Sequence, residues 1–295
     1  MAVLSLLDPD MQTDNNPQSG CVPPSEIARL AEDAAVGKTQ KHPEVTFVLA
    51  VLAGIFISLA GMFYTIVTTG TEGLPYGMTK LVGGLTFSMG LMMVVLCGAE
   101  LFTSNTLLLM GRATRRLNIA QITRNWTLVY FGNMTGAFFM VVMLMGVSQY
   151  QGAHGEVGIN YMYIANAKMG HNFIQAMMLG ILCNLVVCLT YWMTLSARSA
   201  AGKMLACTLP VACFLAAGFE HSIANMFLLP MGLLIKNIAA PEFWAATGYS
   251  ADSFSNITAF NMIVMNIIPA TIGNIIGGGV MVGLSYWFVH LRERD

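Results

Sequence analysis

Two long apolar segments of this chain carry the same acidic motif near their middle, and this duplication constrains the fold more than any other feature. The motif, Gly-x-Glu-x-x-x-x-Asn, begins at Gly98 in one segment and at Gly218 in the other. It places Glu100 and Glu220 at membrane depth, where ionisable groups are costly and usually face a bundle interior or a water-filled path. The fold must therefore shield two carboxyl groups from lipid.

Composition identifies the chain as an integral membrane protein. Of its 295 residues, 56% are hydrophobic and only 10% are charged, whereas a soluble domain has about 25% charged residues. The apolar runs are uninterrupted, which indicates helices and not the alternating strands of a membrane barrel. The sequence shows no basic tract for nucleic acid, no metal-ligand spacing among its six cysteines, no cofactor motif and no cleaved signal peptide.

Six transmembrane helices are predicted in a pore domain over residues 43–291. Their expected ranges are 46–68, 79–110 with a break, 125–148, 173–195, 205–235 with a break, and 258–290.

Two further segments precede these helices. Residues 1–24 are polar and proline-rich and predict a flexible tail. The apolar spacing after Ser25 predicts an amphipathic helix over 25–42 on the cytoplasmic surface. Whether this helix only packs or also acts as a gate stays open.

Basic residues orient the helices, because they are enriched in cytoplasmic connections. Eleven of the 14 lie on one side of the predicted topology and three on the other. The eleven are Arg29, Lys38, Lys41, Arg112, Arg115, Arg116, Arg124, Arg198, Lys203, Arg292 and Arg294; the three are Lys80, Lys168 and Lys236. Both termini are therefore expected in the cytoplasm.

The chain also contains an inverted repeat, with one half over about 46–148 and the other over about 173–290. Three motifs recur in the same order, one in each helix: Phe-x-x-Ala-x-x-x-Gly-Ile from Phe47 and Phe173, the acidic motif, and Gly-Asn-x-x-Gly from Gly132 and Gly273. Each half has three helices, an odd number, so the second half must enter the membrane upside down. Inverted halves with interrupted helices indicate a transport path near the midplane.

The motif residues predict how the two breaks are stabilised. Gly98 and Gly218 allow backbone conformations that interrupt a helix, and the freed polar groups must then be buried in protein or line a cavity. A structural role is favoured over direct transport for both carboxyl groups and for the Asn residues that end the motifs. These four residues are Glu100, Asn105, Glu220 and Asn225.

The halves differ most at His221, whose counterpart is Leu101. A histidine can donate a hydrogen bond to a small anion or exchange a proton near neutral pH, so His221 is the main functional candidate. Leu101, Phe102 and Thr103 on the other break would supply an apolar throat and one hydroxyl group.

Other polar residues allow two interpretations. Asn133 is interpreted as part of close helix packing between small residues. Asn274 fits packing and a polar path equally well, because Gly277-Gly278-Gly279 follows it. Asn184 stands where the first half has Ser58. By composition alone, Phe87, Leu91, Val187 and Phe214 are ordinary core residues.

The chain resembles the formate/nitrite transporter family over about residues 25–290, and its motifs are most like those of formate channels. The resemblance is carried by Lys80-Leu81-Val82-Gly83-Gly84, Gly98 to Ser104, Gly218 to Met226, and Ile272-Gly273-Asn274. It implies an aquaporin-like six-helix fold with the second and fifth helices broken, assembled as a homopentamer with one pore in each protomer.

The resemblance also implies the roles of individual residues. One constriction would come from Phe87 and Phe214, and another from Leu91, Leu101 and Val187. Thr103 would face His221 in a chamber between them, with Asn184 and Asn274 as polar contacts and Lys168 as a vestibule residue that attracts anions.

The expected function is passage of formate and similar small monovalent anions across the bacterial inner membrane, as a channel or a proton-coupled carrier. Nitrite, hydrosulfide or a neutral solute are alternative substrates. A membrane enzyme that uses Glu220 and His221 is the alternative of another class, but the sequence has no His-Glu-x-x-His pair, nucleophile elbow or phosphate loop.

Overall fold

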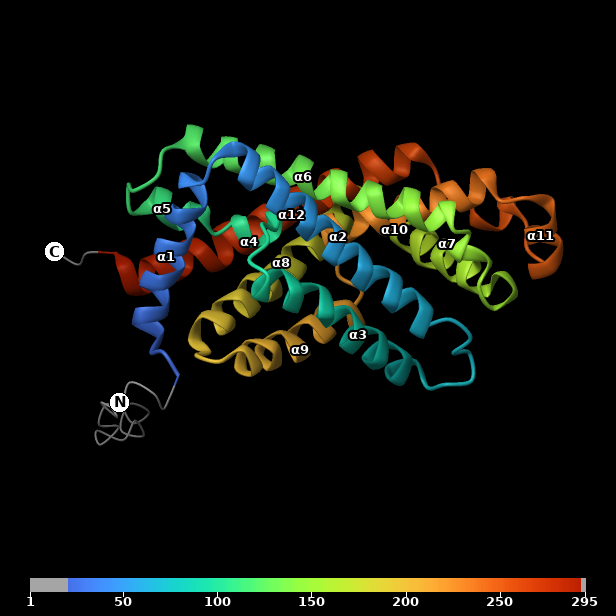
Figure 1. Ribbon diagram of the computed structural model, residues 1–295, viewed down its shortest axis with the longest axis horizontal. Coiled ribbons are helices and arrows are strands. Elements are labelled where there is room, and N and C mark those ends of the chain that lie inside the picture. The colour runs from blue at the N-terminus through green and yellow to red at the C-terminus, as the bar shows by residue number, and fades with distance from the viewer. Residues whose placement is uncertain (1–20, 293–295) are drawn as a thin grey trace.

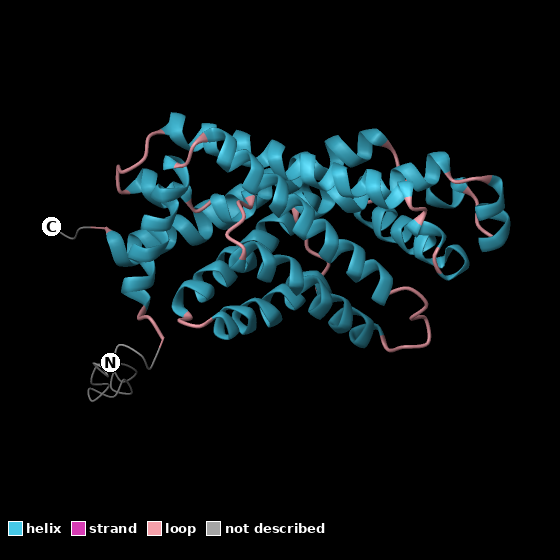
Figure 2. Cartoon of the chain, in the orientation of Figure 1, coloured by secondary structure: helices cyan, strands magenta, loops and turns pink. Residues whose placement is uncertain are grey.

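The computed structural model describes residues 21–292, and within them the chain forms helices and loops without any strand (Figures 1 and 2). The α-helices are α1 (Pro24–Gln40), α2 (Pro43–Val67), α3 (Tyr76–Leu96), α4 (Phe102–Asn105), α5 (Leu108–Ala113), α6 (Ile119–Gly146), α7 (Glu156–Met169), α8 (Phe173–Ser196), α9 (Ala200–Ala216), α10 (Ser222–Ile238), α11 (Pro241–Thr247) and α12 (Ile268–Asn274). Short 3₁₀ turns lie at Gln149–Gln151, Ala153–Gly155 and Ala251–Phe254.

The last part of the chain is one continuous helix, Asn261–Leu291, which we call the last helix. α12 is its regular middle. The wider π-helical turns around it are Asn261–Ile267, Ile275–Leu284 and Trp287–Leu291.

Within residues 21–292, five helices are long and apolar enough to cross a membrane: α2, α3, α6, α8 and the last helix. α10 and α11 pass the same test together across a bend of 104°, which gives a sixth, and α9 is a shorter apolar helix. The all-helical membrane fold predicted from the sequence is therefore confirmed. Figure 1 shows α1 near one end of the molecule's long axis and α11 near the other.

The two halves repeat the same close helix contacts. α2 packs along α6 in the first half, and α8 packs along α12 in the second. A Cβ atom at Gly136 would collide with the Val51 carbonyl oxygen, and one at Gly277 with the Ile181 carbonyl oxygen. Small residues let membrane helices approach until their backbones touch, so these glycines set the distance between the helices of each pair.

The first helix packs onto the bundle. Ile27, Ala28 and Ala31 are buried in a cluster that includes side chains of α8 and the last helix. Arg116, between α5 and α6, pairs with Asp33 at 2.6 Å and with Glu32 at 3.2 Å. The expected tail over 1–24 lies outside the described residues as far as position 20.

α7 has no counterpart in the predicted topology, which begins the second half at residue 173. It precedes α8 as α1 precedes α2. Each of these two preceding helices carries a lysine in its last turn, Lys38 in α1 and Lys168 in α7. The internal repeat therefore includes this extra helix in both halves.

Substitution of Gly136 by Ala should destabilise the protein, because the new Cβ would force α2 and α6 apart. Overpacking of this kind costs about 1–3 kcal/mol, so the Tm of the purified protein in detergent should fall by several degrees. Gly146→Ala is the matched control at the end of the same helix, where a Cβ meets nothing within 4 Å. Equal Tm values for the two variants would contradict the importance of this contact.

Candidate functional site

Two loops interrupt helices in the interior of the bundle, one at residues 97–101 and the other at 217–221 (Figure 2). Gly98 and Gly218 have φ angles of +69° and +72°, a region that favours glycine. In each loop the backbone N–H of the glutamate donates to a helix other than the two that flank the break. Glu100 N donates to Leu49 O of α2 at 3.2 Å, and Glu220 N donates to Leu179 O of α8 at 3.4 Å.

A buried asparagine stabilises the first break. Asn133 Nδ2 donates to Ala50 O at 2.7 Å and to Glu100 O at 2.8 Å. Its Oδ1 accepts from Phe102 N at 2.9 Å. One side chain thus satisfies three backbone groups that lipid could not.

Asn274 makes the same three contacts at the second break. Its Nδ2 donates to Gly180 O at 2.8 Å and Glu220 O at 3.0 Å, and its Oδ1 accepts from Ser222 N at 2.9 Å. Both amide hydrogens are therefore committed to the backbone. This geometry gives Asn274 a structural role at the break, and the polar contact with a solute that the resemblance implies stays a prediction.

The carboxylate of Glu100 is 1% exposed and lies among donors on the side of the bundle nearest α1. Lys41 Nζ is 2.6 Å from Oε1, and Lys38 Nζ is 3.6 Å from Oε2. Asn105 Nδ2 donates to Oε2 at 2.9 Å and also to Asn125 Oδ1 at 2.9 Å. We call the group formed by Lys38, Lys41 and Glu100 the α1 mouth.

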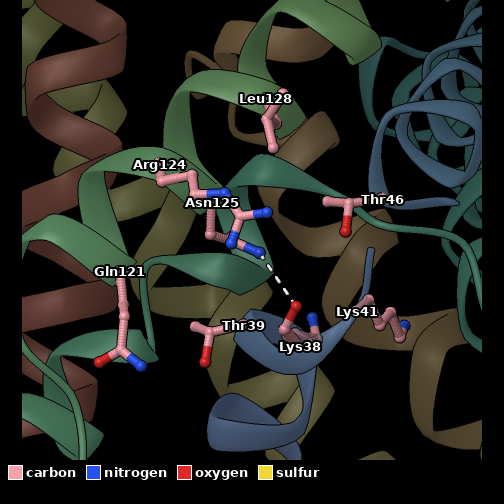
Figure 3. A pocket seen from close by; sticks show the side chains of 8 residues that line it. All are labelled: Lys38, Thr39, Lys41, Thr46, Gln121, Arg124, Asn125 and Leu128. Atoms are coloured by element: carbon pink, nitrogen blue, oxygen red, sulfur yellow. Dashed lines mark hydrogen bonds between the residues drawn. The ribbon is translucent and has the colours of Figure 1, made fainter. Parts of the chain in front are cut away.

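A cavity of about 390 Å³ opens at the α1 mouth, and its lining includes the three residues of the mouth together with Val94, Val95 and Ser104. On the other side of α1, Asn125 of α6 donates to the backbone carbonyl of Lys38 at 3.4 Å (Figure 3). The figure shows Lys38, Thr39 and Lys41 lining one pocket together with Gln121, Arg124, Asn125 and Leu128 of α6. This contact with α6 therefore helps to position Lys38.

The carboxylate of Glu220 is fully buried and lies in a mirrored group of donors. Lys168 Nζ is 3.1 Å from Oε2, Asn266 Nδ2 is 3.2 Å from the same oxygen, and Asn225 also donates to it. Lys168, the vestibule residue that the resemblance implies, therefore pairs with a buried carboxylate. His171 Nε2 is 3.5 Å from Oε1, and we call the group formed by Lys168, His171 and Glu220 the α7 mouth.

His221 lies at the second break, with its ring orientation fixed at both nitrogens. Its Nδ1 accepts from Ala224 N at 3.1 Å at the start of α10. The proton of the neutral ring must therefore be on Nε2, which is 3.2 Å from Thr103 Oγ1. His221 is 4% exposed and Thr103 is fully buried, so a donor and a hydroxyl face each other in the protein interior.

Apolar side chains surround this polar pair. The rings of Phe87 and Phe214 meet edge to face at 6.1 Å, and the Phe214 ring stacks on that of His221 at 6.0 Å. Leu91 is four residues, or about 6 Å along the helix axis, from Phe87 towards the α1 mouth. Leu91, Leu101 and Val187 are all buried.

Phe102 and Asn184 both contact neighbouring helices. The ring of Phe102 packs against the rings of Trp126 and Tyr130 of α6, with centroid distances of 6.0 and 5.0 Å. Asn184 Nδ2 donates to the carbonyl oxygens of Thr103 and Asn274 at 3.1 and 2.6 Å. Among the described residues its Oδ1 has no hydrogen-bond partner.

Sequence reasoning missed Asn125 and Asn266, which bind the asparagines of the acidic motifs. A signal for them was present: each lies eight residues before Asn133 or Asn274, at the same place in the two halves. The Gly-Asn-x-x-Gly repeat therefore extends in both halves to an asparagine seven residues before its first glycine.

Comparisons with known proteins agree with this architecture. The model of the formate/nitrite transporter family matches residues 25–288. The formate channel FocA of Escherichia coli (strain K12) is 51% identical over 272 residues, which cover 92% of this chain and 95% of that protein. The FocA protein of Haemophilus influenzae is 41% identical over 88% of this chain and 92% of its own length.

Solved structures show the same fold. A pentameric formate channel with formate bound superposes with a TM-score of 0.79 at 46% identity, covering 85% of this chain and 98% of that one. A second structure, an ion channel of the same family, has a TM-score of 0.75 at 25% identity, covering 90% of this chain and 99% of the other.

Substitution of Asn274 by Ala should destabilise the second break, because three buried backbone groups would lose their partner. Each unsatisfied buried group costs about 1–3 kcal/mol, so the Tm in detergent should fall strongly, and Asn133→Ala should cause a similar loss. Asn261→Ala is the control in the same helix, since its amide donates only to the Asn256 carbonyl. A native Tm for Asn274→Ala would show that the break does not depend on this side chain.

Proposed function

The chain belongs to the formate/nitrite transporter family, and from this premise we propose that it carries formate and similar small monovalent anions across the bacterial inner membrane. Two formate channels that are 51% and 41% identical support this assignment. The structural observation that carries it is the donor of His221, which faces Thr103 between apolar side chains in the protein interior.

We propose a path that joins the two mouths through this centre. From the α1 mouth it passes Leu91, Leu101 and Val187, reaches His221 and Thr103, and continues between Phe87 and Phe214 to the α7 mouth. The apolar side chains remove water from the solute, and an isolated charge in such surroundings is very costly. A hydrogen-bond donor at the centre offsets part of this cost for an anion and offers nothing to a cation.

We propose that His221 acts as a neutral donor through Nε2. Its Nδ1 already accepts a hydrogen bond from Ala224 N. If Nε2 gave its proton to formate, the ring would become an imidazolate unless Nδ1 first gained a proton and lost that bond. A carboxylate that accepts a hydrogen bond from Nε2–H requires neither change.

Assembly and orientation complete the proposal. The similar formate-bound channel is pentameric, and we propose the same assembly here, with one pore in each protomer. Eleven of the 14 basic residues lie on the side of the α1 mouth in the predicted topology, so this mouth is placed in the cytoplasm together with both termini.

Nitrite is the second candidate substrate, because the description of the matching family includes it and nitrite is another small monovalent anion. The relatives named above are channels, which supports transport over catalysis by Glu220 and His221.

The role of His221 is tested by two substitutions that remove its titration but differ in hydrogen bonding. His221→Asn should keep most formate flux, since asparagine suits the N-cap position and retains an N–H donor. His221→Leu should lower the initial rate of ¹⁴C-formate uptake into proteoliposomes by about ten- to a hundredfold, the value of a hydrogen bond to a charged group.

His154→Asn, at an exposed position, controls for general effects of replacing a histidine. A His221→Leu protein with native Tm and native flux would contradict the donor role. Loss of flux in both His221 variants, with native Tm, would favour proton transfer by the imidazole.

A further inference from the structure

Each buried carboxylate has two basic neighbours separated by three positions in the sequence. Lys38 and Lys41 contact Glu100 at the α1 mouth. Lys168 and His171 contact Glu220 at the α7 mouth. The two groups are alike except that the second cation of the α7 mouth is a histidine, the side chain that changes charge between pH 5 and 8.

His171 lies near one particular oxygen of Glu220. Lys168, Asn225 and Asn266 all contact Oε2. The other oxygen, Oε1, is buried and has no hydrogen-bond partner within the described part of the chain. His171 Nε2 lies 3.5 Å from it, and the histidine side chain is 33% exposed. Protons from solvent can therefore reach a ring that faces an unpaired carboxylate oxygen.

The net charges of the two mouths follow from these contacts. At the α1 mouth two ammonium groups face one carboxylate, which leaves one positive charge. Burial on its own lowers the pKa of Lys38, but the Glu100 carboxylate more than offsets this and the pKa lies above its ordinary value. The charge of the α1 mouth is therefore fixed over the physiological range.

At the α7 mouth the charges of Lys168 and Glu220 cancel when His171 is neutral, and one positive charge remains when His171 is protonated. Resting on the proposed function, we infer that His171 controls how strongly the α7 mouth attracts anions: formate enters there more readily in acid than at neutral pH, while the α1 mouth attracts it equally in both.

The other groups near the α7 mouth leave this role to His171. Lys80 on α3 lies within electrostatic range of Lys168, and a lysine keeps its charge between pH 5 and 8. Cys183 on α8 is a fully buried thiol, and His221 on the second break is 4% exposed. His171 is thus the titratable group of the cluster with direct access to solvent.

The expected effect follows from one added charge a few ångströms from the entering anion. In a partly hydrated vestibule this should change the KM for formate by about three- to tenfold. His171→Lys makes the α7 mouth a copy of the α1 mouth, so its KM should be low at both pH values. His171→Gln cannot gain a charge, so its KM should be high at both.

We would measure initial ¹⁴C-formate uptake into right-side-out and everted membrane vesicles, with the external solution at about pH 5.5 or 7.5 and the interior at a constant pH. The native protein should show the pH-dependent KM in one vesicle orientation, where the α7 mouth faces the external solution. His42→Gln is the control, because His42 lies next to the α1 mouth and pairs with Glu44 instead.

The inference is overturned if the KM for formate of His171→Gln depends on external pH as strongly as that of the native protein. It is also overturned if the KM of the native protein is the same at both pH values in both vesicle orientations. Absence of any formate flux in the native protein would instead reject the proposed function. Histidine NMR of the purified protein then tests His171 independently of flux: the His171 ring is identified as the signal absent from His171→Gln, and a ring that keeps one charge state at both assay pH values also overturns the inference.

Discussion

The structure depends on satisfying backbone groups where two helices stop inside an apolar bundle. Neither lipid nor a hydrophobic side chain can accept or donate the hydrogen bonds that the breaks expose. Asn133 and Asn274 supply them with the same three contacts each, and close glycine contacts keep the helices that carry these residues near the breaks. Because these asparagines supply the hydrogen bonds of the backbone, the side chains of Thr103 and His221 can face each other.

Charge and polarity are separated along the proposed path. The buried carboxylates belong to the two mouths, where lysine and histidine side chains reach them from α1 and α7 and from the residues just after these helices. The centre holds one imidazole donor, one hydroxyl and apolar rings. An anion would be attracted at the mouths by charge and accommodated at the centre by a hydrogen bond, so that no full positive charge holds it at the midpoint of the proposed path.

Much of this arrangement could be predicted from the sequence, because paired motifs report architecture. The six apolar segments, the positions of the glycines and the contrast between His221 and Leu101 were sufficient for the fold class and for the central candidate. The direction in which a buried side chain points could not be predicted from the sequence. Phe102 contacts α6, and Asn274 commits its amide to the backbone. Such choices depend on partners from other helices, which one sequence does not reveal.

The order of the ion pairs along the chain has a consequence for biosynthesis. Lys41 is made 59 residues before Glu100, and Lys168 is made 52 residues before Glu220. In both halves the cation therefore leaves the ribosome before its carboxylate. Each acidic segment can enter the membrane with its neutralising cation already synthesised, so neither carboxylate waits at bilayer depth as an unpaired charge.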